Sequence, residues 1–517
     1  MMLRRIACAA MLCAAVASAA QAATVIGTGT PASCTSAAVR KAVVAGGKAT
    51  FNCGPDPVVI EFDRCATVSA VLTLDGNGLV TLRGTDVCTD AQFFSVTTTG
   101  TLTLTGLVLS DATGTAIRND GTTVIEDSML QGNGTPDSPT APVVNGGAIV
   151  NNGTLTVRNS AFVENRTTGK GGAIFASSTA KMTIINTSFV GNSADSGGAL
   201  YVSRGLVVNG TFVRNRAVTD GGAFANARPD TLGATLRNTL IVGNVSGEPD
   251  GNCAAARPEG AASVVVDGGG NFQHPGVGCG ATIATVDPRV LPAGYYGGHT
   301  VVAPLAPGSP VGDAGVPVLC QPDDQRGAPR NRVSSGGFTI CSPGAVELAA
   351  SDVDPRQTAI EYYYPARDHY FITPLPAEIQ ALDGGRFPGW TRTGGTIPVL
   401  VDTGQQILAT FPVCRFYGLP AAGLDSHFFS ATPLECQQVI ERFPGAWLLE
   451  TTSLFSMHLP AASGACPVGT DPVYRLFNNR ADVNHRYTTS PATRSQMIAQ
   501  GWIPEGVGTG GVWCALH

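Results

Sequence analysis

Gly146-Gly-Ala-Ile149 returns along this chain as Gly171-Gly-Ala-Ile174, Gly197-Gly-Ala-Leu200 and Gly221-Gly-Ala-Phe224. The four motifs begin 25, 26 and 24 residues apart. A period of this length indicates stacked coils, because one such unit cannot bury its apolar face until a neighbour covers it. Glycine suits the corner of a coil, where it accepts positive φ and lets neighbouring backbones approach closely.

A second phrase lies between the glycine motifs, with alternating apolar residues, an asparagine, a phenylalanine and a further asparagine. It occurs as Val157, Asn159, Phe162 and Asn165, and again as Ile184, Asn186, Phe189 and Asn192. Alternation places every second side chain on the inner face of a strand. The sequence therefore predicts a right-handed parallel β-helix. We expect two inward columns, Ile149, Ile174, Leu200 and Phe224 in one and Phe162, Phe189, Phe212 and Ile241 in the other, and a ladder of Asn133, Asn165, Asn192, Asn215 and Asn244.

The composition favours turn-rich β structure. Of 517 residues, 14% are charged and 64 are glycine, which penalises helix interiors and does not suit a disordered chain. The length predicts at least two folded units. A net charge of −6 gives no basic surface for nucleic acid, so no nucleic-acid partner is expected.

Residues 1–23 predict a secretory signal peptide, with Arg4 and Arg5 before an apolar run and a small-residue cleavage site at 20–22. No later apolar run is long enough to predict a transmembrane segment. We therefore expect a secreted or cell-surface protein. Twelve of the 14 cysteines remain after the signal, an even number that favours disulfides over metal ligands. These candidates are Cys34 and Cys53, Cys65 and Cys88, Cys253 and Cys279, Cys320 and Cys341, and, with pairing left open, Cys414, Cys436, Cys466 and Cys514.

Residues 36–45 predict a short helix that ends at Gly46. Lying just before the first coils, it would cap the open edge of the stack. The β-helix is expected over residues 24–347, followed by a linker at 348–356.

Beyond residue 244 the chain resembles the choice-of-anchor Q type of bacterial β-helix protein. The resemblance rests on Gly270-Asn-Phe272, Asp287-Pro-Arg289, Gly297-Gly-His-Thr300, Asp324-Gln-Arg-Gly327 and Cys341 to Glu347, and it covers residues 34–347. It implies a secreted or surface-exposed β-helix of a group that mostly lacks an assigned activity.

The tail at residues 357–517 contains a different repeat. His369, His427 and His485 lie 58 residues apart, each after a strand and before a short helix, and Trp390, Trp447 and Trp502 follow. Three equal units predict an aromatic-rich, β-rich domain with pseudo-threefold closure. The pattern over 357–516 resembles a secreted bacterial repeat family of unknown function.

Catalytic groupings are weak in the helix domain. Asp111, Asp127, Asp195 and Asp220 fall at differing coil positions, whereas glycoside cleavage needs two carboxyl groups about 5–10 Å apart. Lyase chemistry would need a base such as Lys170, Lys181 or Arg166 beside calcium-binding acids. A polysaccharide lyase or glycoside hydrolase with a carbohydrate-binding tail stays the alternative interpretation.

The tail histidines have three interpretations: structural hydrogen bonding, zinc binding on a threefold axis, or ligand binding together with the tryptophans. We predict no metal site and no cofactor. The favoured interpretation is a non-catalytic scaffold or adhesion protein, in which a β-helix stalk presents a module that binds glycan or another cell-surface component. The candidate binding residues are His369, His427, His485, Trp390, Trp447 and Trp502. The sequence does not fix the ligand, the oligomeric state or the mode of surface retention.

Overall fold

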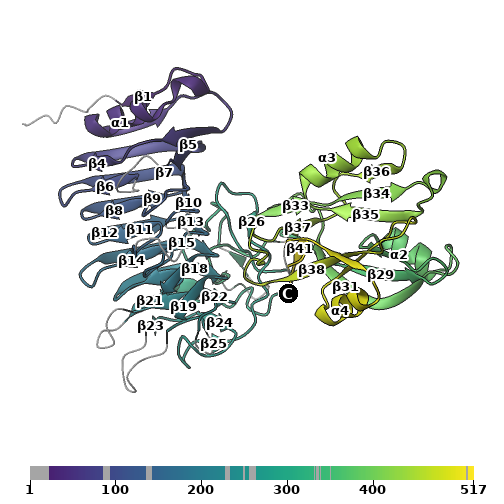
Figure 1. The fold of residues 1–517 in the computed structure, drawn as a ribbon. Helices are drawn as coiled ribbons and strands as arrows, with labels where there is room; N and C mark the ends of the chain where they lie inside the picture. The colour runs from purple at the N-terminus through teal and green to yellow at the C-terminus, as the bar shows by residue number, and fades with distance from the viewer. Residues whose placement is uncertain are drawn as a thin grey trace, which may run out of the picture.

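A computed structural model gives the structure of the chain, and it describes residues 23–85, 93–134, 143–226, 233–247, 251–254, 264–330, 332–333, 337, 339–349, 351–507 and 510–517. The protein is mostly β, with long parallel sheets in its first half and antiparallel sheets in its C-terminal part (Figure 1). The predicted signal peptide and Cys88 lie outside the described residues, except for Ala23.

Parallel strands stack in the order of the chain, as in a right-handed β-helix, which confirms the predicted fold class. The long sheet follows β1 (Thr24–Ile26), β2 (Gly47–Phe51), β5 (Val71–Gly84), β7 (Thr101–Ser110), β10 (Met129–Gln131), β13 (Ala161–Val163), β15 (Lys181–Val190), β18 (Gly205–Val213), β22 (Leu240–Val242), β24 (Phe272–His274) and β25 (Ala284–Thr285). Its further strands are β3 (Val58–Phe62), β9 (Thr122–Glu126), β12 (Thr154–Arg158), β21 (Ala234–Arg237) and β23 (Val265–Asp267). The second sheet follows β4 (Ala66–Val68), β6 (Phe94–Val96), β8 (Ile117–Asn119), β11 (Ile149–Asn151), β14 (Ile174–Ala176), β17 (Leu200–Tyr201) and β20 (Phe224–Ala225). A short pair joins β16 (Ser193–Ser196) to β19 (Arg216–Asp220).

Both predicted inward columns are confirmed. Ile149 pairs with Ile174, which pairs with Leu200, and the second column runs in register from Phe162 through Phe189 to Phe212. The Phe189 ring stacks on both neighbours, with centroids 4.9 Å from Phe162 and 4.6 Å from Phe212. Burial of these rings in successive coils supplies the continuous core.

The asparagine ladder is present and extends one residue further than predicted. The Nδ2 of Asn165 donates to Oδ1 of Asn192 at 2.9 Å, and Asn192 donates in the same way to Asn215. The chain of amides runs from Asn133 through Asn244 to Asn252. Each amide also donates to a backbone carbonyl, as Asn192 does to Phe162, so buried polar groups satisfy one another along the stack.

The helix α1 (Ser36–Ala45) lies at the N-terminal end of the stack, as the sequence predicted (Figure 1). Thr35 caps it by accepting a hydrogen bond from the Ala38 backbone N–H, and Gly46 ends it at φ 69°. The apolar face of the helix contributes Val39, Ala42 and Val43 to the core of the stack.

The segment between β25 and residue 347 folds back over the coils. Its short elements are β26 (Gly294–Tyr295), η2 (Pro317–Leu319), β27 (Arg332–Val333) and β28 (Thr339–Ile340). Arg330 is fully buried there and donates to the carbonyl oxygens of Ser342 and Gly344 at 3.1 and 2.8 Å and to Asn186 Oδ1 at 3.2 Å. Burial lowers the pKa of Arg330 to about 10, against the nearby carboxylate of Glu347.

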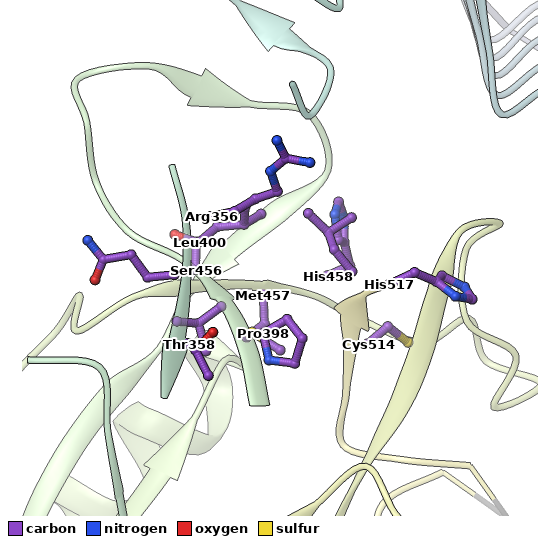
Figure 2. Close-up of a pocket in the computed structure, with 12 residues that line it drawn as sticks. Arg356, Thr358, Pro398, Leu400, Ser456, Met457, His458, Cys514 and His517 are labelled. Carbon is purple, nitrogen blue, oxygen red and sulfur yellow. The ribbon is translucent and has the colours of Figure 1, made fainter. Parts of the chain in front are cut away.

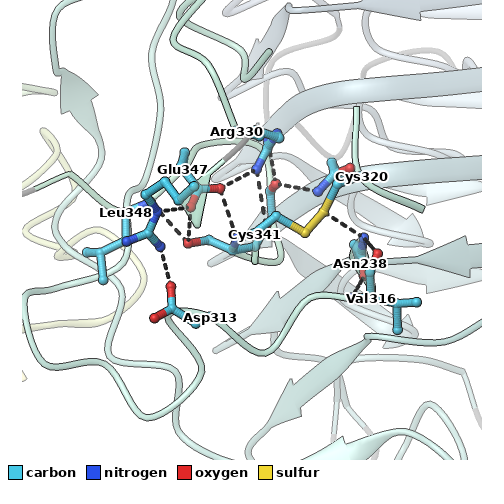
Figure 3. Close-up of a disulfide and its surroundings, with 12 residues drawn as sticks. Asn238, Asp313, Val316, Cys320, Arg330, Cys341, Glu347 and Leu348 are labelled. Atoms are coloured by element: carbon cyan, nitrogen blue, oxygen red, sulfur yellow. Dashed lines mark hydrogen bonds and ion pairs between the residues drawn. A yellow bond between two sulfur atoms is a disulfide. The ribbon is translucent and has the colours of Figure 1, made fainter. Parts of the chain in front are cut away.

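Figure 3 shows Arg330 beside the Cys320–Cys341 disulfide. There the backbone N–H of Val316 donates a hydrogen bond to Oδ1 of Asn238 at 2.8 Å. Asn159, Asn186, Asn209 and Asn238 all have φ between 46° and 52°, so the first asparagine of each repeated phrase forms a left-handed turn. Three of these turns, at Asn186, Asn209 and Asn238, bind the returning segment.

The C-terminal part contains three antiparallel units. The first has β29 (Arg356–Tyr364), β30 (His369–Thr373), α2 (Pro376–Asp383) and β31 (Thr391–Leu400), followed by β32 (Gln406–Ile407) and β33 (Thr410–Pro412). The second has β34 (Cys414–Gly418), η3 (Pro420–Ala422), β35 (Ser426–Ser430), α3 (Pro433–Arg442), β36 (Trp447–Thr451) and β37 (Ser456–His458). The third has β38 (Thr470–Phe477), β39 (His485–Thr488), α4 (Pro491–Ala499), β40 (Ile503–Glu505) and β41 (Trp513–Leu516).

The C-terminal part lies beside the stack rather than at its end (Figure 1), and β32 pairs with β26 of the returning segment. Apolar residues from both sides pack at this joint, among them Tyr296, Val302 and Leu400. The described disulfides are Cys34–Cys53, Cys253–Cys279, Cys320–Cys341, Cys414–Cys436 and Cys466–Cys514. Cys65 is disulfide-bonded, while its predicted partner Cys88 lies outside the described residues.

Candidate functional site

The hairpin register defines which tail residues are equivalent. Tyr370 pairs with Tyr363 in the first unit, His427 with Tyr417 in the second, and His485 with Phe477 in the third. Tyr370, and not His369, is therefore the counterpart of His427 and His485. The equal spacing of 58 residues suggested three equivalent histidines, and that assignment is wrong because the hairpin loops differ in length.

His369 is the counterpart of Ser426 and Asn484, and the three side chains lie buried where the three units meet. Each residue bonds the backbone of the next unit: His369 Nδ1 lies 3.2 Å from the Asp425 carbonyl, and Ser426 Oγ donates to Val483. Asn484 accepts from the Tyr370 N–H at 2.8 Å and donates to its carbonyl at 3.1 Å. Asp482 completes the surroundings of His369, 3.1 Å from Nε2. These hydrogen bonds join the three units in a closed ring.

His369→Ala is expected to lower the free energy of unfolding by about 2–4 kcal/mol, because it removes a fully buried ring that contacts the Asp425 carbonyl and Asp482 and leaves a cavity between the units. His427→Ala, whose side chain is 23% exposed, should cost about 1 kcal/mol or less. Chemical denaturation of the two variants measures the difference. His369→Asn gives the first unit the residue that the third unit has at this position, Asn484, and should recover part of the loss. Equal costs at His369 and His427 would contradict the assignment.

Carboxylate–arginine pairs tie each unit to the next. Arg415 binds Glu378 at 2.9 Å, and Arg475 binds Glu435 at 2.7 Å, each from a first strand to the preceding unit's helix. The third pair is reversed, because Glu361 takes the strand position of the two arginines and binds Arg486 at 2.9 Å. The three contacts link the first unit to the second, the second to the third and the third to the first.

The three candidate tryptophans occupy equivalent places at the start of β31, β36 and β40, the strands that follow the helix of each unit, but their surroundings differ. Trp390 is half-buried and stacks on Tyr364 at 5.4 Å, whereas Trp502 is 7% exposed and meets the edge of Tyr370. Trp447 is half-buried and packs edge-on against Phe428 at 6.1 Å. Of the three, only Trp447 lines a described pocket.

That pocket, of about 340 Å³, lies between the second and third units. Its aromatic lining combines Phe443, which is 51% exposed, with Trp447 and Phe477, and its polar lining includes Glu435, Arg442 and Glu505. His485 brings its ring to the inner wall, 5.0 Å from Phe428 and 5.4 Å from Phe477. Hence two of the six candidate residues, Trp447 and His485, share one hollow, and we call it the aromatic pocket.

The imidazole of His485 is kept neutral. Burial lowers its pKa to about 3, and the neighbouring Arg475 guanidinium acts in the same direction. Glu505 lies 3.4 Å from Nε2, but a neutral imidazole carries no charge, so this contact is not an ion pair. Glu435, by contrast, has a lowered pKa, because hydrogen bonds from Arg475 outweigh the burial that would raise it.

The low pKa of His485 predicts acid sensitivity. An unfolded histidine takes up a proton below about pH 6.5 while the folded one does not, so stability is lost as the pH falls from about 6.5 toward 3. The slope reaches at most about 1.4 kcal/mol per pH unit. Protonation of Glu435 also lowers the stability of the protein as the pH falls. Comparing the parent with a His485 variant that retains Glu435 therefore isolates the contribution of His485. The cost of His485→Gln, measured by denaturation, should be largest near neutral pH and shrink on acidification. A constant cost would refute the assignment.

A second pocket, of about 250 Å³, lies where the ends of β29, β31, β37 and β41 meet (Figure 2). Arg356, Ser456, His458 and Cys514 line it. His458 is 7% exposed, and its Nδ1 donates to the Ala409 carbonyl at 3.0 Å. Burial lowers the pKa of His458. Sequence reasoning missed this residue because it lies outside the repeated histidine pattern.

Within the described ranges, no group of three or more histidine, cysteine, aspartate or glutamate residues is arranged to hold a metal ion. The same part of the chain contains no helix of the length and apolar character that a membrane crossing requires.

Comparison with known proteins gives two matches. Residues 358–512 match the family described as a domain of unknown function, DUF5648. Residues 159–177, the part of one coil that contains Phe162, Asn165 and the Gly171 motif, match the Chlamydia polymorphic membrane protein repeat. No curated protein and no solved structure matches the chain. Neither match is to the choice-of-anchor Q type, so that resemblance stays a prediction, while the DUF5648 region coincides with the three-unit tail.

Proposed function

We propose that the protein is a non-catalytic, surface-exposed scaffold whose β-helix is a stalk and whose DUF5648 region binds glycan through the aromatic pocket. The repeat match of residues 159–177 is to a family named for a membrane protein and supports a surface-related role. The disulfides are compatible with an oxidising extracellular setting.

The composition of the aromatic pocket carries the glycan proposal. Sugars present apolar C–H faces and hydroxyl edges, which match aromatic rings beside carboxylates and a guanidinium. Phe443 and Trp447 offer exposed ring surface, and Glu435, Glu505 and Arg442 border it. A ligand seated there would contact the rings and the charged groups together.

The test uses the full chain on a glycan array, followed by calorimetric titration of the best ligand. Trp447→Ala and Phe443→Ala should each weaken binding about tenfold, since one lost ring contact corresponds to about 1.4 kcal/mol. Trp390→Ala is the matched control, because Trp390 takes the same place in the first unit and lies outside the pocket. The proposal fails if no glycan binds, or if Trp390→Ala weakens binding as much as Trp447→Ala.

A further inference from the structure

One surface position of the β-helix alternates between charged residues and glycine. Gly132, Glu164, Gly191, Arg214 and Gly243 come just before Asn133, Asn165, Asn192, Asn215 and Asn244, and Asp111 holds the same position in the preceding coil. All six have φ between 52° and 65°. A non-glycine residue in this left-handed conformation costs about 1–2 kcal/mol. Glu164 and Arg214 therefore stand where glycine would be less strained, which draws attention to what their side chains do.

The coil between those of Glu164 and Arg214 has small side chains at two positions on this face. It carries Gly191 before its ladder asparagine and Ser193 after it, while the neighbouring coils carry Arg166 and Arg216 at the place of Ser193. Neighbouring coils lie about 4.8 Å apart, so charged side chains flank the small coil on both sides. The result is a hollow with Gly191 and Ser193 as its floor.

The C-terminal part closes this hollow into a pocket of about 520 Å³, which we call the joint pocket. Leu408 and Ala409, His458, and Pro467 with Val468 form the opposite wall. The loop that contains Pro467 and Val468 passes close to Arg214, because a Cβ added to Gly469 would lie 3.0 Å from the guanidinium Nε. The pocket thus exists only where the stack and the tail meet.

The charges of the joint pocket are unbalanced. Arg166, Arg214 and Arg216 face a single carboxylate, Glu164. Among the described residues, the side chains of these three arginines make no hydrogen bond and no ion pair within 4 Å. Burial lowers the pKa of Arg214, and the positive charge of Arg356 adds to this effect. A desolvated guanidinium without a carboxylate at contact favours an incoming anion.

His458 supplies a second, independent feature. It is 7% exposed and lines the joint pocket as well as the pocket of Figure 2. Because Nδ1 donates to Ala409, a neutral imidazole has its lone pair on Nε2, and Nε2 is buried with no hydrogen-bond partner in the described structure. The wall of the joint pocket therefore contains a hydrogen-bond acceptor for which the described residues supply no donor.

We propose that the joint pocket binds a small ligand with an oxyanion group, a carboxylate, sulfate or phosphate, held by Arg214 and Arg216. This site is separate from the aromatic pocket and does not depend on the glycan proposal. Its position between the stack and the tail means that the ligand would contact both parts and stabilise the joint.

The test titrates the full chain with sodium phosphate, sodium sulfate and sodium D-glucuronate at constant ionic strength, by calorimetry and thermal shift. At least one probe should bind saturably with a Kd of about 1 mM or tighter. Binding of glucuronate alone would identify a carboxylate ligand, and binding of phosphate or sulfate a tetrahedral oxyanion. The absence of saturable binding by all three would overturn the proposal.

Two variants sharpen the test. Arg214→Gly places at this position the residue that three other coils carry there, so the fold should stay within about 1 kcal/mol of the parent while affinity falls at least tenfold. Gly191→Glu puts a carboxylate on the floor of the pocket and should abolish binding. Gly243→Glu is its matched control, since Gly243 has a similar φ, 60° against 65°, with open space around it. Equal loss in the two glutamate variants, or full binding by Arg214→Gly, would refute the site.

Discussion

Phe189→Asp is expected to disrupt the stack, with a loss of about 5 kcal/mol or more. The ring is fully buried and lies between those of Phe162 and Phe212, so the change removes a large apolar side chain and leaves a carboxylate without a partner in the core. Removal of the ring alone costs about 3–5 kcal/mol. Circular dichroism during heating, together with limited proteolysis, should show a strongly lowered melting temperature and cleavage within the neighbouring coils.

Val59→Asp is the control for this change. Val59 lies in β3 of the same sheet but is 51% exposed, so the new carboxylate stays in water. Its effect should be within about 1 kcal/mol. If Phe189→Asp melts like Val59→Asp, the inward position of Phe189 is wrong.

Asn192→Asp is the second large effect, although the two side chains have nearly the same shape. Asn192 donates to the Phe162 carbonyl and to Asn215 Oδ1, and its own Oδ1 accepts from both the N–H and the Nδ2 of Asn165. A carboxylate keeps the acceptor but loses both donors, and it buries a charge against two oxygen atoms. We expect a loss of about 3–5 kcal/mol at neutral pH.

Chemical denaturation of Asn192→Asp against Asn77→Asp measures this effect. Asn77 is exposed, has φ 51° and takes no part in the ladder, so its exchange should change stability by about 0.5 kcal/mol at most. Partial recovery of Asn192→Asp at low pH is expected, because protonation removes the buried charge and restores one donor. Indistinguishable stabilities of the two variants would show that the ladder amides contribute little.

The coil architecture could be predicted from sequence because each coil repeats the same physical requirement. Apolar residues such as Phe162 and Phe189 must alternate to face inward, and asparagines such as Asn165 must recur where the backbone needs amide partners. A wrong assignment in one coil can be recognised because it disagrees with the pattern of the neighbouring coils. The helix α1 was predictable for a local reason, since Thr35 and Gly46 are ordinary cap residues.

The tail was predictable in outline but not in register. Its three units have hairpin loops of different length, and a count along the chain aligned His369 with His427, although pairing places Tyr370 there. The reversed Glu361–Arg486 pair shows the same limit, because contacts between units depend on closure in space.

The joint pocket left a signal in the sequence that became meaningful only with the structure. The alternation of Glu164, Gly191 and Arg214 before successive ladder asparagines can be read from the chain. What the chain does not reveal is that His458 and Pro467, more than 200 residues further on, lie against this face.

All described disulfides join cysteines that are near each other in sequence, with separations of 19, 26, 21, 22 and 48 residues. None of these five crosslinks requires the C-terminal part to be present before a bond in the stack can close. The strands of the stack likewise pair with strands that precede them in the chain. Assembly can therefore proceed in the direction of synthesis, with α1 and the Cys34–Cys53 bond as the earliest template, and a chain interrupted late still holds a correctly oxidised N-terminal stack.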